Sequence, residues 1–318
     1  MNQTQYKGID EYLFQKRTHR ELSQEGLALA LQQFDPLFTE LDSLTISRWE
    51  RGRVSPNIRR QVALMEFFGD EPHLLLANPD FELKQLPSMS AFQQMLAQQT
   101  NYNHVMGAHP YIPQDELNFE KLNKRSDNLL QKLRWVCNAH NNLTRQRESW
   151  DAEFLAQLVL FPSTEAIFYQ IDDILMGHSL YIRIDEDTLS ALLSGKMQET
   201  QLSTDDLIEQ DKPACLYMLS GYIGGRHVAE DSLLHMLFTL LENPLNLSLG
   251  YKARSDIGIK LMDFLSGKRV GQGEVLSERL DGAKYRGKRY SYISFNLPRA
   301  DLIASPLMLN VMRNQGRT

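Results

Sequence analysis

The sequence predicts a small, all-α N-terminal domain followed by a larger α/β (α+β) domain. Apolar side chains recur every three or four residues through roughly the first 70 positions, as amphipathic helices require. Later, strand-length apolar runs alternate with helical patterns, which is typical of α/β and α+β folds. A chain of 318 residues is also long enough for two domains. We expect a helical domain over residues 1–70, a linker with a short helix over 71–113, and an α/β domain over 114–318.

Composition sets limits on the class of protein. A hydrophobic fraction of 42% and a charged fraction of 23% are typical of a soluble globular chain. No apolar run approaches the ~20 residues of a membrane helix, and the N-terminus has no secretory pattern. Cys137 and Cys215 are the only cysteines and form no C-x-x-C pair. We therefore expect a cytoplasmic protein without a metal site. The net charge of −6 still permits a local basic patch.

The most informative stretch covers residues 42–57. Asp42 or Ser43 can cap a short helix, Ile46 and Trp49 share one face of it, and Gly52 supplies the backbone that ends it. A cap at Ser55 with Pro56 in the first helical position then predicts the next helix, to about residue 68. The face opposite Ile46 carries small polar residues and arginine, as expected of a helix that contacts another molecule.

Two further helices precede this stretch, at residues 8–19 and 23–34, the second capped by Ser23. An insertion over residues 33–41 contains Asp35-Pro36 and predicts a break before the third helix. Either the second helix is longer than usual or a loop protrudes there. Four short helices of this kind predict a helix-turn-helix module.

The motifs in this region resemble those of the Xre/Cro/phage-repressor family over residues 8–69. Leu22-Ser23-Gln24-Glu25-Gly26-Leu27-Ala28 is similar to L-T-Q-x-x-L-A, and Thr45 to Gly52 with Pro56 is similar to T-I-S-x-W-E-x-G-x-x-x-P. The resemblance implies an ion pair between Arg17 and Glu50. It also implies DNA contacts, to phosphates or to base edges, by these residues: Gln24, Ser43, Leu44, Thr45, Ser47, Arg48, Arg51 and Arg53.

In the C-terminal part, the pattern of apolar residues predicts alternating helices and strands. The expected helices cover residues 115–142, 150–161, 187–193, 230–241 and 255–265, and the linker helix covers 90–100. The expected strands cover residues 166–170, 178–184, 214–223, 245–251, 274–280 and 289–296.

This order resembles, in part, the second half of the GNAT acetyltransferase fold. That family places a Q/R-x-x-G-x-G/A loop before a helix, where backbone N–H groups hold coenzyme A phosphates. The corresponding segment here is Gly224-Gly225-Arg226-His227-Val228-Ala229, followed by Glu230 and Asp231. With a helix beginning near Asp231, two carboxylates would stand where the phosphates bind and would repel them.

The sequence therefore favours a sequence-specific DNA-binding transcription regulator that is not an enzyme. Its C-terminal domain would dimerise or sense a ligand, and its partners would be double-stranded DNA, a second copy of the chain, and a small-molecule or protein signal. No catalytic residue, metal ligand or cofactor site is predicted. The alternative is an acyltransferase-like enzyme that carries a DNA-targeting module. The basic hairpin with Lys284, Arg286, Lys288 and Arg289 is either a second anion contact or a solvated tip.

Overall fold

Two units make up the chain in the computed structural model, which describes residues 6–83, 117–144, 149–171, 174–223, 226–277 and 282–315. The first unit contains residues 1–89 together with 300–318, and the second contains residues 90–299. The last 19 residues thus belong with the N-terminal helices, whereas the predicted division placed them in the α/β domain. The predicted linker helix at 90–100 lies outside the described residues.

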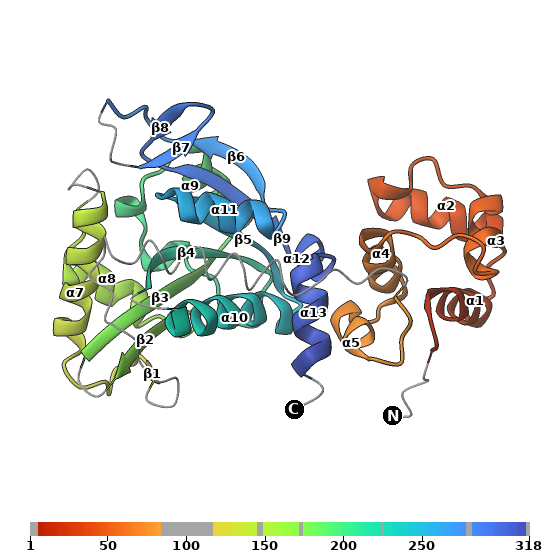
Figure 1. Ribbon diagram of the computed structural model, residues 1–318, viewed down its shortest axis with the longest axis horizontal. Helices are drawn as coiled ribbons and strands as arrows, with labels where there is room; N and C mark the ends of the chain where they lie inside the picture. The colour runs from red at the N-terminus through yellow and green to blue at the C-terminus, as the bar shows by residue number, and fades with distance from the viewer. Residues whose placement is uncertain are drawn as a thin grey trace. The chain divides into compact units, whose positions relative to one another are not determined.

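The first unit is helical (Figure 1). Its elements are α1 (Ile9–His19), α2 (Gln24–Phe34), the 3-10 turn η1 (Pro36–Phe38), α3 (Ser43–Glu50), α4 (Ile58–Phe68), α5 (Pro72–Ala77) and, from the end of the chain, α13 (Pro306–Gln315). Ile46 and Trp49 of α3 are buried, as predicted. The predicted ion pair between Arg17 and Glu50 is confirmed, with Arg17 Nη2 3.1 Å from Glu50 Oε2.

Local capping explains where these helices begin and end. Asp42 accepts a hydrogen bond from the Thr45 N–H at 2.7 Å, and Ser23 accepts one from the Gly26 N–H at 2.9 Å. Gly52 ends α3 with a φ of +64°, a conformation that costs glycine little. The last predicted cap is corrected: Asn57, not Ser55, caps α4, so Pro56 lies before the helix.

The second unit is a mixed α/β fold around a seven-stranded sheet of order β1-β2-β3-β4-β5-β9-β6. The strands are β1 (Asn118–Lys121), β2 (Glu165–Ile171), β3 (Ile174–Ile184), β4 (Ala214–Ile223), β5 (Asn246–Ala253), β6 (Lys268–Gln272) and β9 (Ile293–Pro298). Neighbours are antiparallel except β4 and β5, which are parallel. A separate hairpin consists of β7 (Ala283–Tyr285) and β8 (Lys288–Tyr290).

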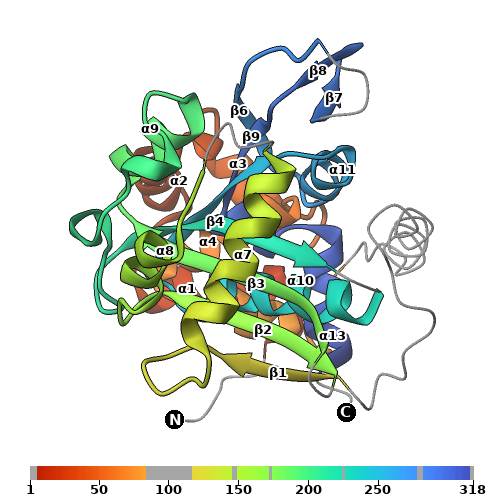
Figure 2. The same ribbon diagram turned by 90° about the vertical axis from the view of Figure 1, so that its left-hand side faces the viewer.

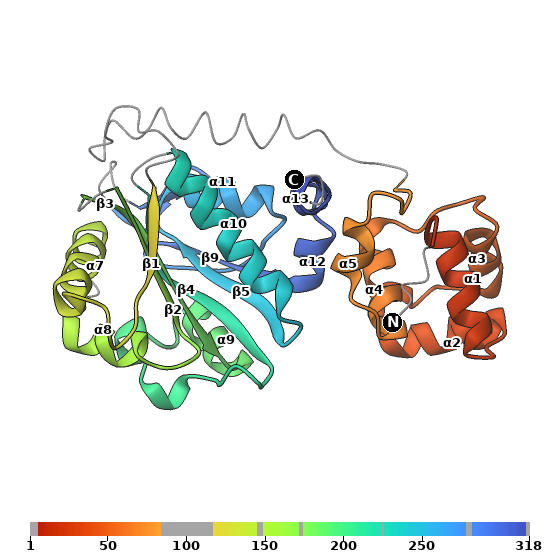
Figure 3. The same ribbon diagram turned by 90° about the horizontal axis from the view of Figure 1, so that it is seen from below.

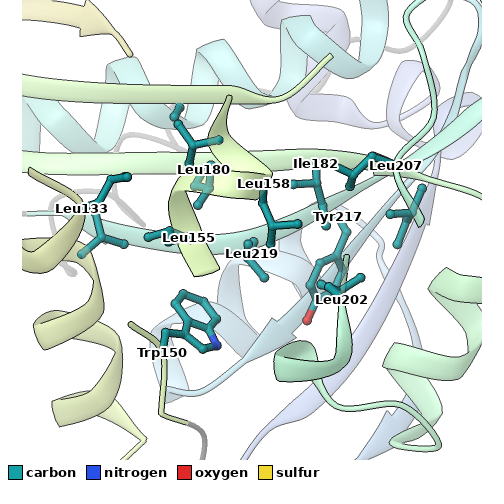
Figure 4. Packing of buried hydrophobic residues seen from close by; sticks show 14 of the residues in the cluster. Leu133, Trp150, Leu155, Leu158, Leu180, Ile182, Leu202, Leu207, Tyr217 and Leu219 are labelled. Atoms are coloured by element: carbon teal, nitrogen blue, oxygen red, sulfur yellow. The ribbon is translucent and has the colours of Figure 1, made fainter. Parts of the chain in front are cut away.

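Helices cover both faces of this sheet. The helices are α7 (Leu129–Leu143), α8 (Ala152–Val159), α9 (Glu186–Ser194), α10 (Arg226–Glu242) and α11 (Asp256–Phe264). Figures 2 and 3 show α7, α8 and α9 on one face, with α10 and α11 on the other. The main apolar core lies under the first group and includes Leu133, Leu155 and Tyr217 (Figure 4). A smaller cluster around Ile167 and Val228 lies on the opposite face.

The structure corrects three predicted elements. The helix expected over residues 115–142 is instead strand β1 followed by α7, because Asn118–Lys121 pairs with β2. Of the strand expected over 274–280, residues 274–277 form only an isolated bridge between Val275 and Tyr290, and residues 278–280 lie outside the described residues. The strand in this region is β6 at Lys268–Gln272, a mostly exposed edge strand whose polar sequence shows no alternation. The strand expected over 289–296 is divided between β8 and β9.

No helix in the described part of the chain is long and apolar enough to cross a membrane.

Candidate functional site

The parallel strands β4 and β5 separate at their carboxyl ends. Their pairing ends at Met218 and Tyr251, although β4 continues to Ile223 and β5 to Ala253. Beyond that point β4 pairs with β3 and β5 pairs with β9. In the described sheet, one edge of each strand therefore presents backbone N–H and C=O groups without a strand partner, and such groups bind an extended ligand well.

A β-bulge explains the separation. Met218 opposes Tyr181 and Ser220 opposes Leu180, so Leu219 is an extra residue in β4. A bulge of this kind bends its strand and increases the local twist. Because it follows directly after the last pair with β5, it turns the end of β4 away from β5.

A cavity of about 80 Å³ occupies this separation. Its lining residues come from α7, β3, β4 and β5 and the residue that follows β5: Ala139, His140, His178, Met218, Leu219, Ser220, Gly221, Tyr222, Tyr251, Lys252 and Arg254. It combines apolar walls with a few polar groups, which is the usual character of a small-molecule site.

Helix α10 begins beside the end of β4, and it begins earlier than predicted. It starts at Arg226, so residues 226–229 supply its first backbone N–H groups. No acidic residue lies in its first turn. The predicted repulsion of phosphate by Glu230 and Asp231 is therefore wrong, because these residues lie beyond the N-terminal turn. A 17-residue helix favours an anion at this end.

The buried His178 and the partly buried Ser220 form a polar pair at the wall of the cavity. The Nε2 atom of His178 lies 2.7 Å from the Ser220 Oγ atom, and its Nδ1 atom has no hydrogen-bond partner among the described residues. Burial, together with the nearby His140, lowers the pKa of His178 to about 3. The imidazole is therefore neutral at physiological pH. It fixes the Ser220 hydroxyl in place and is a poor proton acceptor.

A second polar group surrounds Glu199, which is completely buried. The Tyr217 hydroxyl donates a hydrogen bond to it, Arg254 Nη2 lies 2.8 Å from its Oε2, and Lys252 Nζ lies 3.9 Å from its Oε1. Burial opposes ionisation of this carboxyl group, but the positive charges of Arg254 and Lys252 hold its pKa at about 2. Glu199 is thus an ionised carboxylate that anchors two cationic side chains.

A larger cavity of about 380 Å³ adjoins the first. It is lined by Thr144, Gly195, Met197, Gln198, Lys252, Arg254, Gly273, Glu274, Ser291 and Tyr292. Lys252 and Arg254 line both cavities, so the two spaces meet at these cations. The Lys252 ammonium group also lies 4.7 Å from the centre of the Tyr292 ring, which is a favourable cation–π distance.

The sequence alone did not indicate these residues. Lys252 lies one position beyond the predicted strand, and its burial depends on Glu199, which is distant in the chain. Only the excess of charge at Lys252 and Arg254 directly after an apolar strand could have pointed to them.

The predicted DNA-contact residues lie in the first unit. Ser43, Leu44, Arg48, Arg51 and Arg53 are exposed. Ser47 is only 7% exposed, and its contact with DNA stays a prediction. The Gln24 amide donates a hydrogen bond to Glu50 at 2.7 Å. Thr45 is partly exposed.

Other polar side chains outside the two cavities have structural partners. His235 Nε2 lies 2.8 Å from Glu165 Oε2. In the basic hairpin, Arg289 donates a hydrogen bond to the Gly282 carbonyl at 2.9 Å, and Arg286 packs on Tyr285. Among the described residues, no group of three or more His, Cys, Asp or Glu side chains is placed to hold a metal ion.

No family model matches the chain, and no curated protein matches its sequence. Solved structures do share similarity with it. Arabidopsis thaliana NAA60 in complex with acetyl-CoA is 13% identical, with a TM-score of 0.37, and the match covers 57% of this chain and 98% of that one. FeeM, an N-acyl amino acid synthase from uncultured soil microbes, is 12% identical, with a TM-score of 0.39 and coverage of 61% and 97%. The loading GNATL domain of CurA from Lyngbya majuscula is 12% identical, with a TM-score of 0.39 and coverage of 57% and 98%.

These findings correct the main functional prediction. The solved structures that resemble this chain include acyl-transferring enzymes, and they agree with the partial GNAT resemblance of the sequence. The prediction of a DNA-binding transcription regulator that is not an enzyme is therefore wrong. The similarity itself assigns no substrate to this chain, so any assignment has to come from the geometry of the two cavities.

Proposed function

We propose that the second unit transfers an acyl group from a coenzyme A thioester to an amine. The observation that carries the proposal is the separation of β4 and β5 by the bulge at Leu219, with a cavity between them. The edges along which β4 and β5 no longer pair with each other suit the amide groups of a pantetheine arm. The start of α10, free of acidic residues in its first turn, suits phosphate groups.

A thioester supplies an activated carbonyl carbon that a neutral amine attacks, so that a C–N bond forms, the C–S bond breaks and a proton passes from nitrogen to the thiol. The residues of this chain orient the reactants. Backbone N–H groups beyond Met218 face the place where negative charge develops on the carbonyl oxygen, and such donors lower the barrier. His178 holds Ser220 at the same wall. The larger cavity, which shares Lys252 and Arg254 with the first, is positioned for the amine.

Two measurements on the full chain test this proposal. Titration calorimetry should detect coenzyme A binding, and a thiol assay should detect coenzyme A released from acetyl-coenzyme A in the presence of a mixture of amines. Replacing Ser220 with phenylalanine places a ring in the small cavity and should abolish both signals. The matched control is Ser194→Phe at the exposed end of α9, which should retain coenzyme A binding. Absence of binding by the wild-type protein at millimolar coenzyme A would refute the proposal.

Two further expectations stay predictions. For the first unit they are the resemblance to the Xre/Cro/phage-repressor family and contact with DNA through residues such as Arg48. For the C-terminal domain they are a homodimer and a small-molecule or protein signal.

A further inference from the structure

The walls of the larger cavity carry more positive than negative charge. Among its described lining residues, Lys252 and Arg254 are cationic and Glu274 is anionic. Glu199 is completely buried behind the two cations and balances the remaining positive charge, so an anion would be attracted by direct contact with the two cationic groups and not by a net charge. The two positive groups lie at the boundary with the cavity between β4 and β5, whereas Glu274 is exposed.

The cations are held rigidly. Lys252 is only 2% exposed and packs over the Tyr292 ring, while Arg254 is fixed by its hydrogen bond to Glu199. A side chain held by such partners loses little conformational entropy when it binds a ligand. Thr144, Gln198 and Ser291 add neutral hydrogen-bonding groups to the same cavity. The result is a preorganised site for a small ligand with a carboxylate.

We infer that the acyl acceptor is an amine that bears a carboxylate next to it, a free α-amino acid being the simplest case. This inference rests on the proposed acyl transfer. A carboxylate at Lys252 and Arg254 places the adjacent amino group at the junction of the two cavities, beside the site proposed for the thioester. Polyamines, aminoglycosides and lysine-rich peptides are disfavoured, because an amine without an adjacent carboxylate forms no ion pair with these two groups.

The test compares acceptors that differ only in the carboxylate. Full-length wild-type protein with acetyl-coenzyme A is given phenylalanine, phenylalaninamide or phenethylamine, with spermidine as a polycation, and free thiol is measured. Calorimetry of the same compounds, with coenzyme A present, reports binding independently of turnover. Phenylalanine is expected to exceed its amide by about tenfold to a hundredfold in kcat/KM, the range for a charged hydrogen bond. Equal use of the amide, or a preference for spermidine, would overturn the inference.

Variants add a second line of evidence. Arg254→Gln and Lys252→Met should lose the preference for the amino acid over the amide, and Arg254→Lys should retain part of it. The matched control is Lys260→Met, an exposed lysine on α11, which should keep the full preference. Coenzyme A binding is measured on every variant. If the wild-type protein binds no coenzyme A, the proposed acyl transfer fails; if it transfers acyl groups without a carboxylate preference, only the acceptor inference fails.

Discussion

Glu199 links the stability of the second unit to pH. Its carboxylate is ionised in the folded state with a pKa of about 2, against an ordinary value of 4.5. Because the folded pKa is the lower of the two, Glu199 contributes stability above about pH 4.5, and this contribution is lost as the pH falls towards 2. The shift corresponds to roughly 3 kcal/mol at neutral pH.

We therefore expect Glu199→Gln to be less stable than wild type at pH 7 by about 3–5 kcal/mol, because Arg254 and Lys252 lose their buried counter-charge. Its stability should also fall less steeply between pH 4.5 and pH 2. Hydrogen exchange at the amides of β4 and β5 measures both effects. The exposed Glu242→Gln at the end of α10 serves as control. If the stability of the wild type and that of Glu199→Gln fell equally steeply between pH 4.5 and pH 2, this account would be contradicted.

At the scale of single elements, the bulge in β4 determines whether a ligand cleft exists. Without its extra residue, β4 would continue straight, and its pairing with β5 could extend beyond Met218 and Tyr251. We expect deletion of Leu219 to lower the affinity for coenzyme A at least tenfold, as measured by calorimetry, while circular dichroism still reports a folded sheet.

A second bulge offers a matched control for this deletion. In β6, Arg269 and Gly271 oppose consecutive residues of β9, so Val270 is the extra residue, and its side chain is exposed. Deleting Val270 should leave coenzyme A affinity close to wild type. If both deletions reduce affinity equally, shortening any strand is damaging and the bulge at Leu219 has no special role.

Sequence patterns predicted the central strands but not the feature that makes the site. Residues 214–223 form a mostly apolar run, so β4 could be located to the residue. Leu219 is itself apolar, and nothing in that run distinguishes a bulged residue from a paired one. β6 was missed because an exposed edge strand has no buried face to impose alternation. The start of α10 was misplaced because its first residues, Arg226 and His227, carry no apolar signal.

The candidate site could be predicted only in outline. The resemblance around residues 224–229 pointed to a nucleotide-like ligand at the start of a helix. Because the helix start was misplaced, the carboxylates of Glu230 and Asp231 were expected to repel the phosphates of such a ligand. The pairing of Glu199 with Lys252 and Arg254 joins segments far apart in the chain. Such contacts arise from tertiary packing and leave no local periodicity in the sequence.

At the scale of the whole molecule, the two ends of the chain fold together. Helix α13 packs against α5 in the first unit. Arg313 donates hydrogen bonds to the backbone carbonyls of Leu76 at 2.9 Å and Phe81 at 2.5 Å. These carbonyls lie at the end of α5 and just beyond it, where the orphan acceptors of a short helix need donors. The first unit therefore depends on residues that lie 232 and 237 positions from their partners in the chain.

Replacing Arg313 with alanine should selectively loosen α5. Two charge-assisted hydrogen bonds are lost, each worth about 1.5–3 kcal/mol when the carbonyl remains partly buried. Because a six-residue helix is marginal without tertiary support, we expect the amides of residues 73–77 in α5 to exchange roughly tenfold faster or more. The amides of β4 and β5, which belong to the other unit, should exchange at the wild-type rate. Coenzyme A affinity should also stay at the wild-type value. Arg313→Lys keeps the charge but forms fewer directed hydrogen bonds. Its exchange rates in α5 should therefore lie between those of the wild type and those of Arg313→Ala. Uniform acceleration across both units would instead mean that the last helix stabilises the chain as a whole, and the grouping of the chain ends into one unit would have no energetic meaning.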